Sequence, residues 1–380
     1  MIATSKLALA GAITAALVLG GCGVQEDVTP QGAAAGATIS ALRTSLPAGA
    51  KSAFYDEETR SLWILTLRAA DRKVELSTLD PASNNLRLVA RSAAIANDWA
   101  GGYFARSGGD LFVAWGRHIW RFGAGVGGPV DIALQAADVS SVSDQPGGIV
   151  VLQASSGGLL VVAVTGLSEF ITFDPKTSGW ARMPSGLTST SSGAFSLAAD
   201  GGVVAVGSSD SSPDLTVRRV APGGSYSDEP LSTGPTLLKA RNDGAIASLT
   251  GKGLTLIGSN GVVSEDEFQT YTRTALPIAL GSSDRYAWVA RIADPQKEGT
   301  LELAQVELAS GVLRTVSFPV EVRDGGRQGL ANRPANKSTY IDPGITSIAV
   351  TDAGKAYVLT QCGVSANGSE CLYSAAYVVG

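Results

Sequence analysis

Short apolar segments alternate with tight polar turns along most of the chain. Seven times, an apolar segment leads into a turn rich in glycine, aspartate or serine, and a run of valine, isoleucine, leucine and aromatic residues follows. Glycine supplies the positive φ that tight turns need, and aspartate hydrogen-bonds its own backbone there, so each turn predicts a β-hairpin. The runs begin at Leu62, Leu111, Ile149, Val203, Ile246, Tyr286 and Tyr357, and their mean spacing of about 49 residues predicts a repeated unit of short strands.

A second type of turn recurs with the same period. Its three copies are Leu79-Asp80-Pro81-Ala82-Ser83, Phe173-Asp174-Pro175-Lys176-Thr177-Ser178-Gly179 and Val306-Glu307-Leu308-Ala309-Ser310-Gly311. Their acidic residues are 94 and then 133 residues apart, which is about two and three periods. An apolar residue followed by Asp-Pro-x-Ser/Thr-x-Gly resembles the turn between the third and fourth strands of kelch, quinoprotein-like and WD40-like β-propellers. The resemblance implies an architecture and no particular activity, because propellers of unrelated function share such turns.

The expected fold is all-β, a seven-bladed β-propeller of four-stranded antiparallel blades over residues 38–380. One twisted four-stranded sheet cannot bury both of its faces, whereas sheets packed radially cover one another. The last unit, from Ile345 to Gly380, offers three strands, and Thr38 to Ser45 is expected to add the fourth and close the ring. A pair of β-sandwiches is the alternative architecture. Six or eight blades also stay open, because 71 residues separate Tyr286 from Tyr357.

The N-terminus carries an export signal. Leu7 to Leu19 is an apolar run of thirteen residues after a start that carries one positive charge, and a bilayer-spanning helix needs about 20. The sequence Leu19-Gly20-Gly21-Cys22 then resembles the bacterial lipobox. The resemblance implies a signal peptide over residues 1–21, a lipid such as palmitate on Cys22 and a flexible tether over residues 22–37. An ordinary secretory signal with an incidental cysteine is the alternative.

If Cys22 carries a lipid, the chain is anchored to the cell membrane or the outer membrane. We then expect the folded domain to face the periplasm or the cell exterior. The choice between inner and outer membrane stays open.

Composition agrees with a folded domain and excludes one class of partner. Hydrophobic residues make up 44% of the chain and charged residues 17%, while 46 glycines and 16 prolines favour many short strands. The net charge of −5 gives no field that would attract nucleic acid.

Two cysteines remain after Cys22 is assigned to lipid. Cys362 and Cys371 flank a turn-rich segment of eight residues, so we expect a disulfide that pins a hairpin of the last blade. Such a bond contributes roughly 2.5 kcal/mol in the chain-entropy model, provided that the compartment is oxidising. Two free thiols are the alternative. We expect no metal site, because His118 is the only imidazole and no third sulfur remains.

Catalytic signatures are sparse. Alternation along a strand places His118 on one face with Trp120 and Phe122, so we expect its ring to be packed among aromatic side chains. Motifs of serine hydrolases, zinc proteases, nucleotide-binding loops and dinucleotide-binding folds are absent. Paired acids such as Asp228 and Glu229 lie among serine, proline and glycine, where we expect solvated loop carboxylates. We expect no cofactor.

One basic segment stands out in the acidic chain. Residues 322–337 contain Arg323, Arg327, Arg333 and Lys337 against the single acid Asp324. Forked guanidinium groups in a glycine-rich loop bind carboxylates and phosphates well, so this segment is a candidate binding loop for an envelope protein or an anionic ligand. A flexible insertion is the alternative.

Location, architecture and the missing signatures together favour a monomeric binding or scaffold protein over an enzyme. In this hypothesis the loops of a rigid propeller hold an envelope protein or a ligand. The alternative is a hydrolase or lyase whose carboxylates and arginines meet in the central channel, where sequence spacing does not reveal them. A quinone-dependent dehydrogenase is a weaker third hypothesis, because the residues that hold such a cofactor are not evident.

Overall fold

The computed structural model describes residues 39–380 with gaps, all within the compact unit Gly32–Gly380. The gaps are residues 42–45, 48, 69, 96–101, 117, 124–129, 134–148, 155–157, 165–168, 185–186, 188, 199, 210–211, 223, 232–236, 242, 250–252, 259–260, 268–278, 293–299, 320–344 and 362–373. In the described residues all regular elements are β-strands, and no helix there is long and apolar enough to cross a membrane.

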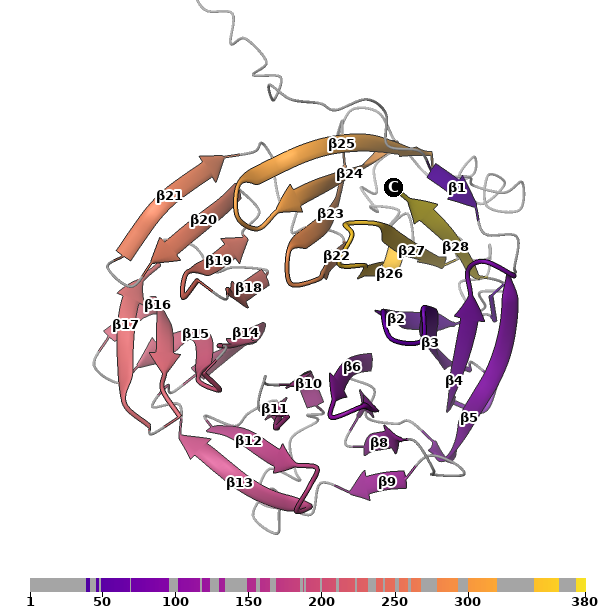
Figure 1. Ribbon diagram of the computed structural model, residues 1–380, viewed down its shortest axis with the longest axis horizontal. Coiled ribbons are helices and arrows are strands. Elements are labelled where there is room, and N and C mark those ends of the chain that lie inside the picture. The colour runs from indigo at the N-terminus through magenta and orange to yellow at the C-terminus, as the bar shows by residue number, and fades with distance from the viewer. Residues whose placement is uncertain are drawn as a thin grey trace, which may run out of the picture. The chain divides into compact units, whose positions relative to one another are not determined.

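The strands form seven four-stranded antiparallel sheets arranged in a ring (Figure 1). Blade 1 holds β2 (Ala50–Asp56), β3 (Ser61–Leu67), β4 (Lys73–Asp80) and β5 (Asn85–Ile95). Blade 2 holds β6 (Gly102–Ser107), β7 (Asp110–Trp115), β8 (His118–Phe122) and β9 (Val130–Ala133). Blade 3 holds β10 (Ile149–Ala154), β11 (Leu160–Val164), β12 (Glu169–Asp174) and β13 (Gly179–Pro184).

Blade 4 holds β14 (Ser189–Leu197), β15 (Val203–Ser209), β16 (Ser212–Val220) and β17 (Tyr226–Pro230). Blade 5 holds β18 (Leu237–Ala240), β19 (Ile246–Leu249), β20 (Gly253–Gly258) and β21 (Gly261–Glu267). Blade 6 holds β22 (Ala279–Ser282), β23 (Tyr286–Ile292), β24 (Thr300–Glu307) and β25 (Gly311–Pro319). Blade 7 holds β26 (Ile345–Val350), β27 (Ala356–Gln361), β28 (Ser374–Val379) and β1 (Ile39–Ala41).

The seven-bladed, all-β prediction is therefore confirmed, and the sandwich alternative is wrong. The first strand of each blade lies nearest the centre of the ring (Figure 1). The other three strands follow it outward, each hydrogen-bonded to the one before it. In blade 7 the outermost strand is β1, in which Ile39 pairs with Val379 of β28.

One of the seven runs opens a different strand of its blade from the other six. The six others precede or open the second strand of a blade, but Ile149 opens β10, the first strand of blade 3. The second strand, β11, begins at Leu160. Ile149 directly follows the pair Gly147-Gly148, and Leu160 lies two positions after the pair Gly157-Gly158, so the sequence offers two similar turns. Counting from Leu160 makes the spacing more even, with 49 residues from Leu111 and 43 to Val203.

The acidic turns have the geometry that their sequence suggests. Between β4 and β5, Asp80 Oδ1 accepts a hydrogen bond from the Ala82 N–H (2.9 Å), and Oδ2 accepts one from Ser83 Oγ (2.6 Å). Between β12 and β13, Asp174 accepts the corresponding bonds from Lys176 and Thr177. The acid and the serine or threonine therefore recur because together they hold the turn between the third and fourth strands.

The hydrophobic core lies between neighbouring blades. Val203 and Ala205 of β15 pack against blade 3, whereas the intervening Val204 and Val206 pack against blade 5. Both faces of the strand are thus buried, which explains why the second strands read as continuous apolar runs instead of alternating ones. Comparable clusters join each pair of neighbouring blades in the described residues, including blades 7 and 1.

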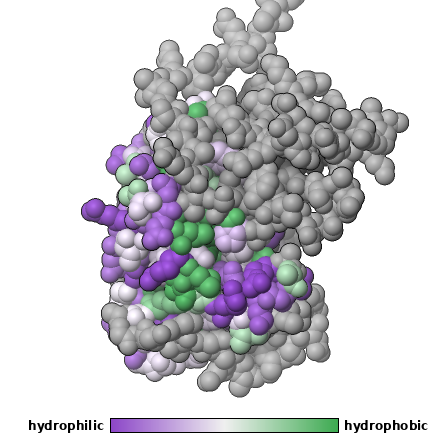
Figure 2. All heavy atoms as spheres, turned by 90° about the vertical axis from the view of Figure 1, so that its right-hand side faces the viewer, coloured by the Kyte–Doolittle hydropathy of each residue, from purple (hydrophilic) through white to green (hydrophobic). Residues whose placement is uncertain are grey.

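The outer surface is more mixed. Figure 2 shows the side of the ring that carries the outer strands of blade 1, where an apolar area is bordered by hydrophilic side chains. On β5, Leu88 is 50% exposed while Ala90 is buried. The outermost strand has no further sheet to cover it, so its apolar residues contribute less to the core.

Polar side chains also join the blades at one end of the ring. The turns from first to second strand and from third to fourth strand lie at the same strand ends, because the strands are antiparallel; we call this end the turn face. Four arginines there reach from one blade to the next, and we call them the cross-blade arginines: Arg106, Arg121, Arg219 and Arg241.

Arg106 illustrates the contact. Its Nε and Nη2 donate hydrogen bonds to Asp56 Oδ1 (3.0 Å) and Oδ2 (2.5 Å), which links blade 2 to blade 1. Burial alone raises the pKa of Asp56, but the hydrogen bonds from Arg106 and Thr59 outweigh it and hold the pKa below its ordinary value of 3.8. Asp56 is therefore a carboxylate that stabilises the ring while it is ionised.

We predict that Ile64→Ala and Leu65→Ala each lower the free energy of unfolding by about 2 to 5 kcal/mol, measured by chemical denaturation. The two side chains are adjacent in β3 and fully buried, but they face blade 7 and blade 2 respectively. The control Leu88→Ala on the exposed face of β5 should change it by about 0.5 kcal/mol or less. A neutral effect at either buried position would contradict burial on both faces.

We predict that Asp56→Asn lowers the free energy of unfolding by about 1 to 3 kcal/mol at pH 7, because it breaks the charged hydrogen bonds to Arg106. The folded-state pKa of Asp56 lies below 3.8, so this contribution is present above that pH and is lost as the pH falls through the folded-state value. Denaturation at pH 7 and pH 3 measures the difference. The control is Asp71→Asn, whose half-buried partner Arg68 lies 3.5 Å away. A gap between wild type and Asp56→Asn that stays constant with pH would refute the assignment.

Candidate functional site

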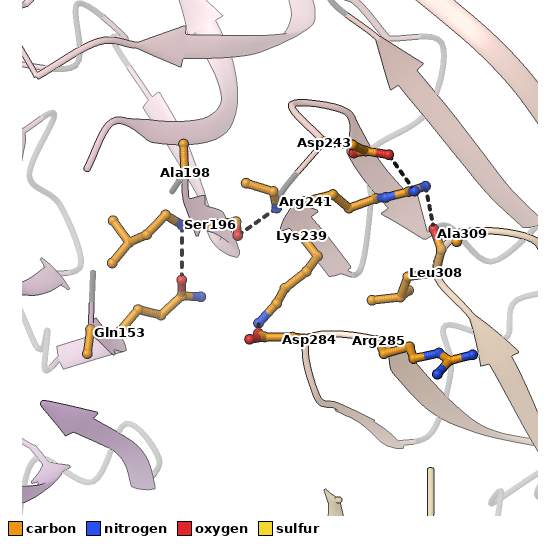
Figure 3. Close-up of a pocket in the computed structure, with 13 residues that line it drawn as sticks. Gln153, Ser196, Ala198, Lys239, Arg241, Asp243, Asp284, Arg285, Leu308 and Ala309 are labelled. Atoms are coloured by element: carbon orange, nitrogen blue, oxygen red, sulfur yellow. Dashed lines mark hydrogen bonds and ion pairs between the residues drawn. The ribbon is translucent and has the colours of Figure 1, made fainter. Parts of the chain in front are cut away.

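A cavity of about 570 Å³ opens on the turn face, and four consecutive blades form its walls (Figure 3). We call it the turn-face cavity. The ends of the innermost strands β10, β14 and β18 contribute Gln153, Ser196 and Lys239. The turns of blades 5 and 6 contribute Arg241, Asp243, Asp284, Arg285, Leu308 and Ala309.

Two of these polar side chains cap the free edge of a neighbouring strand. Ser196 Oγ accepts a hydrogen bond from the Ala240 N–H (2.7 Å), and Gln153 Oε1 accepts one from the Leu197 N–H (3.2 Å). An innermost strand has no partner on its channel side, so its N–H groups need acceptors from elsewhere. The same contacts fix the blades to one another at the wall of the cavity.

The charged groups of the cavity are held in pairs. Lys239 Nζ lies 2.9 Å from Asp284 Oδ1, which joins blade 5 to blade 6. Arg241 Nη2 lies 2.6 Å from Asp243 Oδ2, and its Nη1 donates a hydrogen bond to the Leu308 carbonyl (3.2 Å). Asp284 is 85% exposed, so the rim of the cavity presents a carboxylate to solvent while Lys239 lies deeper.

Arg285 continues this charged surface. Its Nε donates a hydrogen bond to Glu307 Oε1 (2.9 Å), and Ser310 Oγ donates to the other carboxylate oxygen. Hydrogen bonds from Ser310 and Arg285 lower the pKa of Glu307, and the same carboxylate raises the pKa of Arg285. Both groups are therefore charged at neutral pH.

One acid near the cavity behaves differently. Burial and the neighbouring carboxylates Glu57 and Asp284 raise the pKa of Asp352. The Asp352 N–H donates a hydrogen bond to Glu57 Oε1 (2.7 Å) and so links blade 7 to blade 1.

The arrangement is suited to holding a polar ligand. Three basic and two acidic side chains line the turn-face cavity, so a ligand meets donors and acceptors of both signs. In the described part of the chain, no three histidine, cysteine, aspartate or glutamate side chains gather as a metal site would require.

His118 lies away from this cavity. It opens β8, on the hairpin from β7 to β8, and its ring stacks on Trp115 with centroids 4.1 Å apart and planes at 20°. Trp120 and Phe122 lie in the aromatic cluster between blades 1 and 2. His118 is thus packed on an aromatic ring as expected, but the ring is that of Trp115 on the preceding strand.

The interpretation of Asp228 as a solvated loop acid is wrong. Asp228 belongs to β17, and its two carboxylate oxygens accept hydrogen bonds from Nε and Nη2 of Arg218, both at 2.7 Å. The basic partner is ten residues away on β16, so only the pairing of the two strands brings them together.

Several predicted functional residues lie outside the described residues. They are Cys22, Cys362, Cys371, Arg323, Arg327, Arg333 and Lys337. Lipidation, the disulfide and the candidate binding loop therefore stay predictions.

Sequence reasoning missed the residues of the turn-face cavity. Lys239, Arg241 and Asp284 lie within or next to turns that were used only as markers of hairpins. A signal was present, since charged residues follow the innermost strands of two consecutive blades. How many of these charged residues line one cavity depends on which blades are neighbours in the ring, and no local spacing in the sequence encodes that.

Comparisons with known proteins identify the fold. No protein-family model matches the chain, and no curated protein matches its sequence. The streptogramin B lyase structure is similar over 90% of this chain and 98% of its own, with 13% identity and a TM-score of 0.56. The RRP9 WD40 repeats align over 92% and 99%, with 10% identity and a TM-score of 0.56. YCF48 bound to D1 peptide aligns over 91% and 97%, with 12% identity and a TM-score of 0.51. At such low identities these likenesses establish a shared β-propeller architecture.

Proposed function

We propose that this chain is a binding module, held outside the cytoplasm by a lipid on Cys22, whose turn-face cavity engages a segment of an envelope protein. The observation that carries the proposal is the cavity itself, built from four blades and lined by charged side chains that are already held in place. A site that is ordered before binding loses little conformational entropy when its partner arrives.

The charges of the cavity favour a protein segment as the partner. Lys239 and Asp284 form an ion pair near the surface, where such a pair contributes little to stability. A partner that carries its own carboxylate and amine can therefore exchange with this pair at small cost. Complementary charges of both signs would also fix the orientation of the bound segment.

The fold is compatible with this role. YCF48, a propeller of the same architecture, has been solved with a D1 peptide bound. The similarity concerns the fold, so it supports peptide binding as a use of such a ring and says nothing about the partner of this chain.

The hydrolase or lyase alternative is less well supported by two acids of the turn face. Hydrogen bonds hold the pKa values of Asp56 and Glu307 below their ordinary values, as in carboxylates that serve as fixed acceptors. General acids and bases work best with a pKa near the operating pH. Asp56 and Glu307 are thus better suited to joining blades and turns than to transferring protons. Asp352 has a raised pKa, but it is not among the residues that line the turn-face cavity.

We predict that a photo-crosslinking residue at position 309 captures a partner of discrete mass in the native host. Ala309 is exposed and lines the turn-face cavity. The matched control is Ala82, which is exposed at the same position of the acidic turn in blade 1 but lies outside the cavity. Lys239→Glu, which places a like charge beside Asp284, should reduce the adduct several-fold. Equal adducts at both positions, or no effect of Lys239→Glu, would count against the proposal.

We predict that the wild-type chain incorporates radiolabelled palmitate and fractionates with membranes, whereas Cys22→Ala incorporates none and is released. A lipid adds about 0.8 kcal/mol of membrane affinity per buried methylene, so its loss should change fractionation completely. Label that persists in Cys22→Ala, or a wild-type chain that stays unlabelled, would exclude lipidation at this residue.

A further inference from the structure

Arg121 and Arg219 occupy equivalent positions in blades 2 and 4. Each lies on the third strand, directly opposite the second residue of the apolar run that forms the second strand; these opposite residues are Phe112 and Val204. Each arginine also donates hydrogen bonds to backbone carbonyls of the next blade. The repeat therefore allows the surroundings of the two guanidinium groups to be compared position by position.

The two arginines differ in their acidic partner. Nε of Arg121 donates a hydrogen bond to Asp110 Oδ2 (2.6 Å), and Nη2 lies 2.5 Å from the same oxygen. Asp110 is the residue directly before the apolar run, and in blade 4 that position is Gly202. Within the described residues, Arg219 has no carboxylate at ion-pair distance and its Nε has no acceptor. Blade 4 thus keeps the arginine of this pair and lacks the carboxylate.

Backbone carbonyls of blade 5 hold the guanidinium group of Arg219 in place. They belong to Gly244 (2.8 Å from Nη1), Ile257 (3.1 Å from Nη2) and Gly258 (3.0 Å from Nη2). Burial lowers the pKa of Arg219, and the carboxylate of Glu229 opposes this effect more weakly. A guanidinium group has five N–H donors, so the three carbonyls leave donors for a further acceptor. Carbonyls also carry only partial charges, so Arg219 lacks the full negative charge that Asp110 supplies in blade 2.

Arg219 lines a second cavity of about 480 Å³ on the turn face, which we call the interblade cavity. The residues that line it between blades 4 and 5 are Val204, Arg219, Ser227, Ala240, Arg241 and Gly244. Ser227 lies directly opposite Arg219 on β17, so the two side chains share the face that blade 4 turns toward blade 5. Arg241 is already paired with Asp243. Asp200 also lines the cavity, but it is exposed and its Oδ1 accepts a hydrogen bond from the Gly202 N–H (2.8 Å).

We propose that the interblade cavity binds a carboxylate, which accepts hydrogen bonds from Arg219 as Asp110 does from Arg121. A carboxylate is the group that the equivalent position of blade 2 supplies from within the chain. The volume of the cavity leaves room for the rest of the molecule that carries the carboxylate. This site goes beyond the proposed function, because it lies in a different cavity and requires neither Lys239 nor Asp284.

Titration with small acids tests the proposal on the full-length chain with Cys22→Ala. Acetate and N-acetylglycine carry a carboxylate, whereas acetamide and N-acetylglycinamide have nearly the same shapes without the charge. By ligand-observed NMR, at least one acid should bind about tenfold more tightly than its own amide. Tighter binding of N-acetylglycine than of acetate indicates the end of a peptide as the ligand, and otherwise the ligand is a small free acid. Equal binding of each acid and its amide, or no binding of either acid, would overturn the proposal.

Variants then locate the site. Arg219→Gln should weaken binding of the tighter acid about tenfold, because it removes the positive charge. Ser227→Glu should weaken binding by a similar factor, because a carboxylate opposite Arg219 takes the place of the ligand. Ser227→Gln is the matched control, since its side chain has the same size without the charge, and it should change the affinity less than about twofold.

Circular dichroism and thermal unfolding establish whether each variant is folded. If Arg219→Gln does not fold, Ser227→Glu still decides, because Ser227 is exposed and takes no part in the hydrogen bonds that join Arg219 to blade 5. Wild-type affinity in a folded Arg219→Gln chain, or in Ser227→Glu, would place the carboxylate elsewhere and refute the proposal. Equal losses in Ser227→Glu and Ser227→Gln would also refute it, because charge would then play no part.

Discussion

The structure depends on the fact that a four-stranded sheet has two apolar faces and cannot cover either one by itself. Each blade solves this problem for its neighbours, as the alternating valines of β15 illustrate. Radial packing of such sheets leaves no apolar face at the end of a stack, because blade 7 packs against blade 1. Stability is therefore shared among nearest neighbours around the whole ring.

The same constraint determines where the chemistry of the molecule lies. Side chains in the middle strands are occupied with packing, so charged groups gather at strand ends and turns. There they connect neighbouring blades, since arginines of one blade donate hydrogen bonds to a carboxylate or a carbonyl of the next. A cavity forms where these connecting side chains surround a space. The turn-face cavity includes Arg241, a residue that also connects blades 5 and 6.

Local periodicity predicted four strands per unit and seven units, although the 71 residues between Tyr286 and Tyr357 left six or eight units open. Apolar runs such as the one beginning at Val203 reflect burial on two sides, and the acid of turns such as Asp80 reflects hydrogen bonds within four residues. Where two local signals were equivalent, as at Ile149 and Leu160, the sequence did not distinguish the first strand from the second. The pairing of Arg218 with Asp228 and the meeting of Lys239 with Asp284 depend on strand register and on blade packing. No spacing along the chain encodes them, so the site was not predictable in the same way.

The contact between blades 7 and 1 has a consequence for synthesis. Blade 1 is translated before the other blades, and the apolar face that contains Leu62 and Ile64 packs against residues near the C-terminus, such as Leu359 and Ala376, as well as against Leu46. Until the C-terminal residues emerge, the growing chain exposes most of this apolar face to solvent, which favours aggregation. Bringing together residues some three hundred positions apart is also slow, since closing so long a loop costs entropy before any contact rewards it. In a newly made chain, blade 1 is therefore the blade that remains prone to aggregation for the longest time.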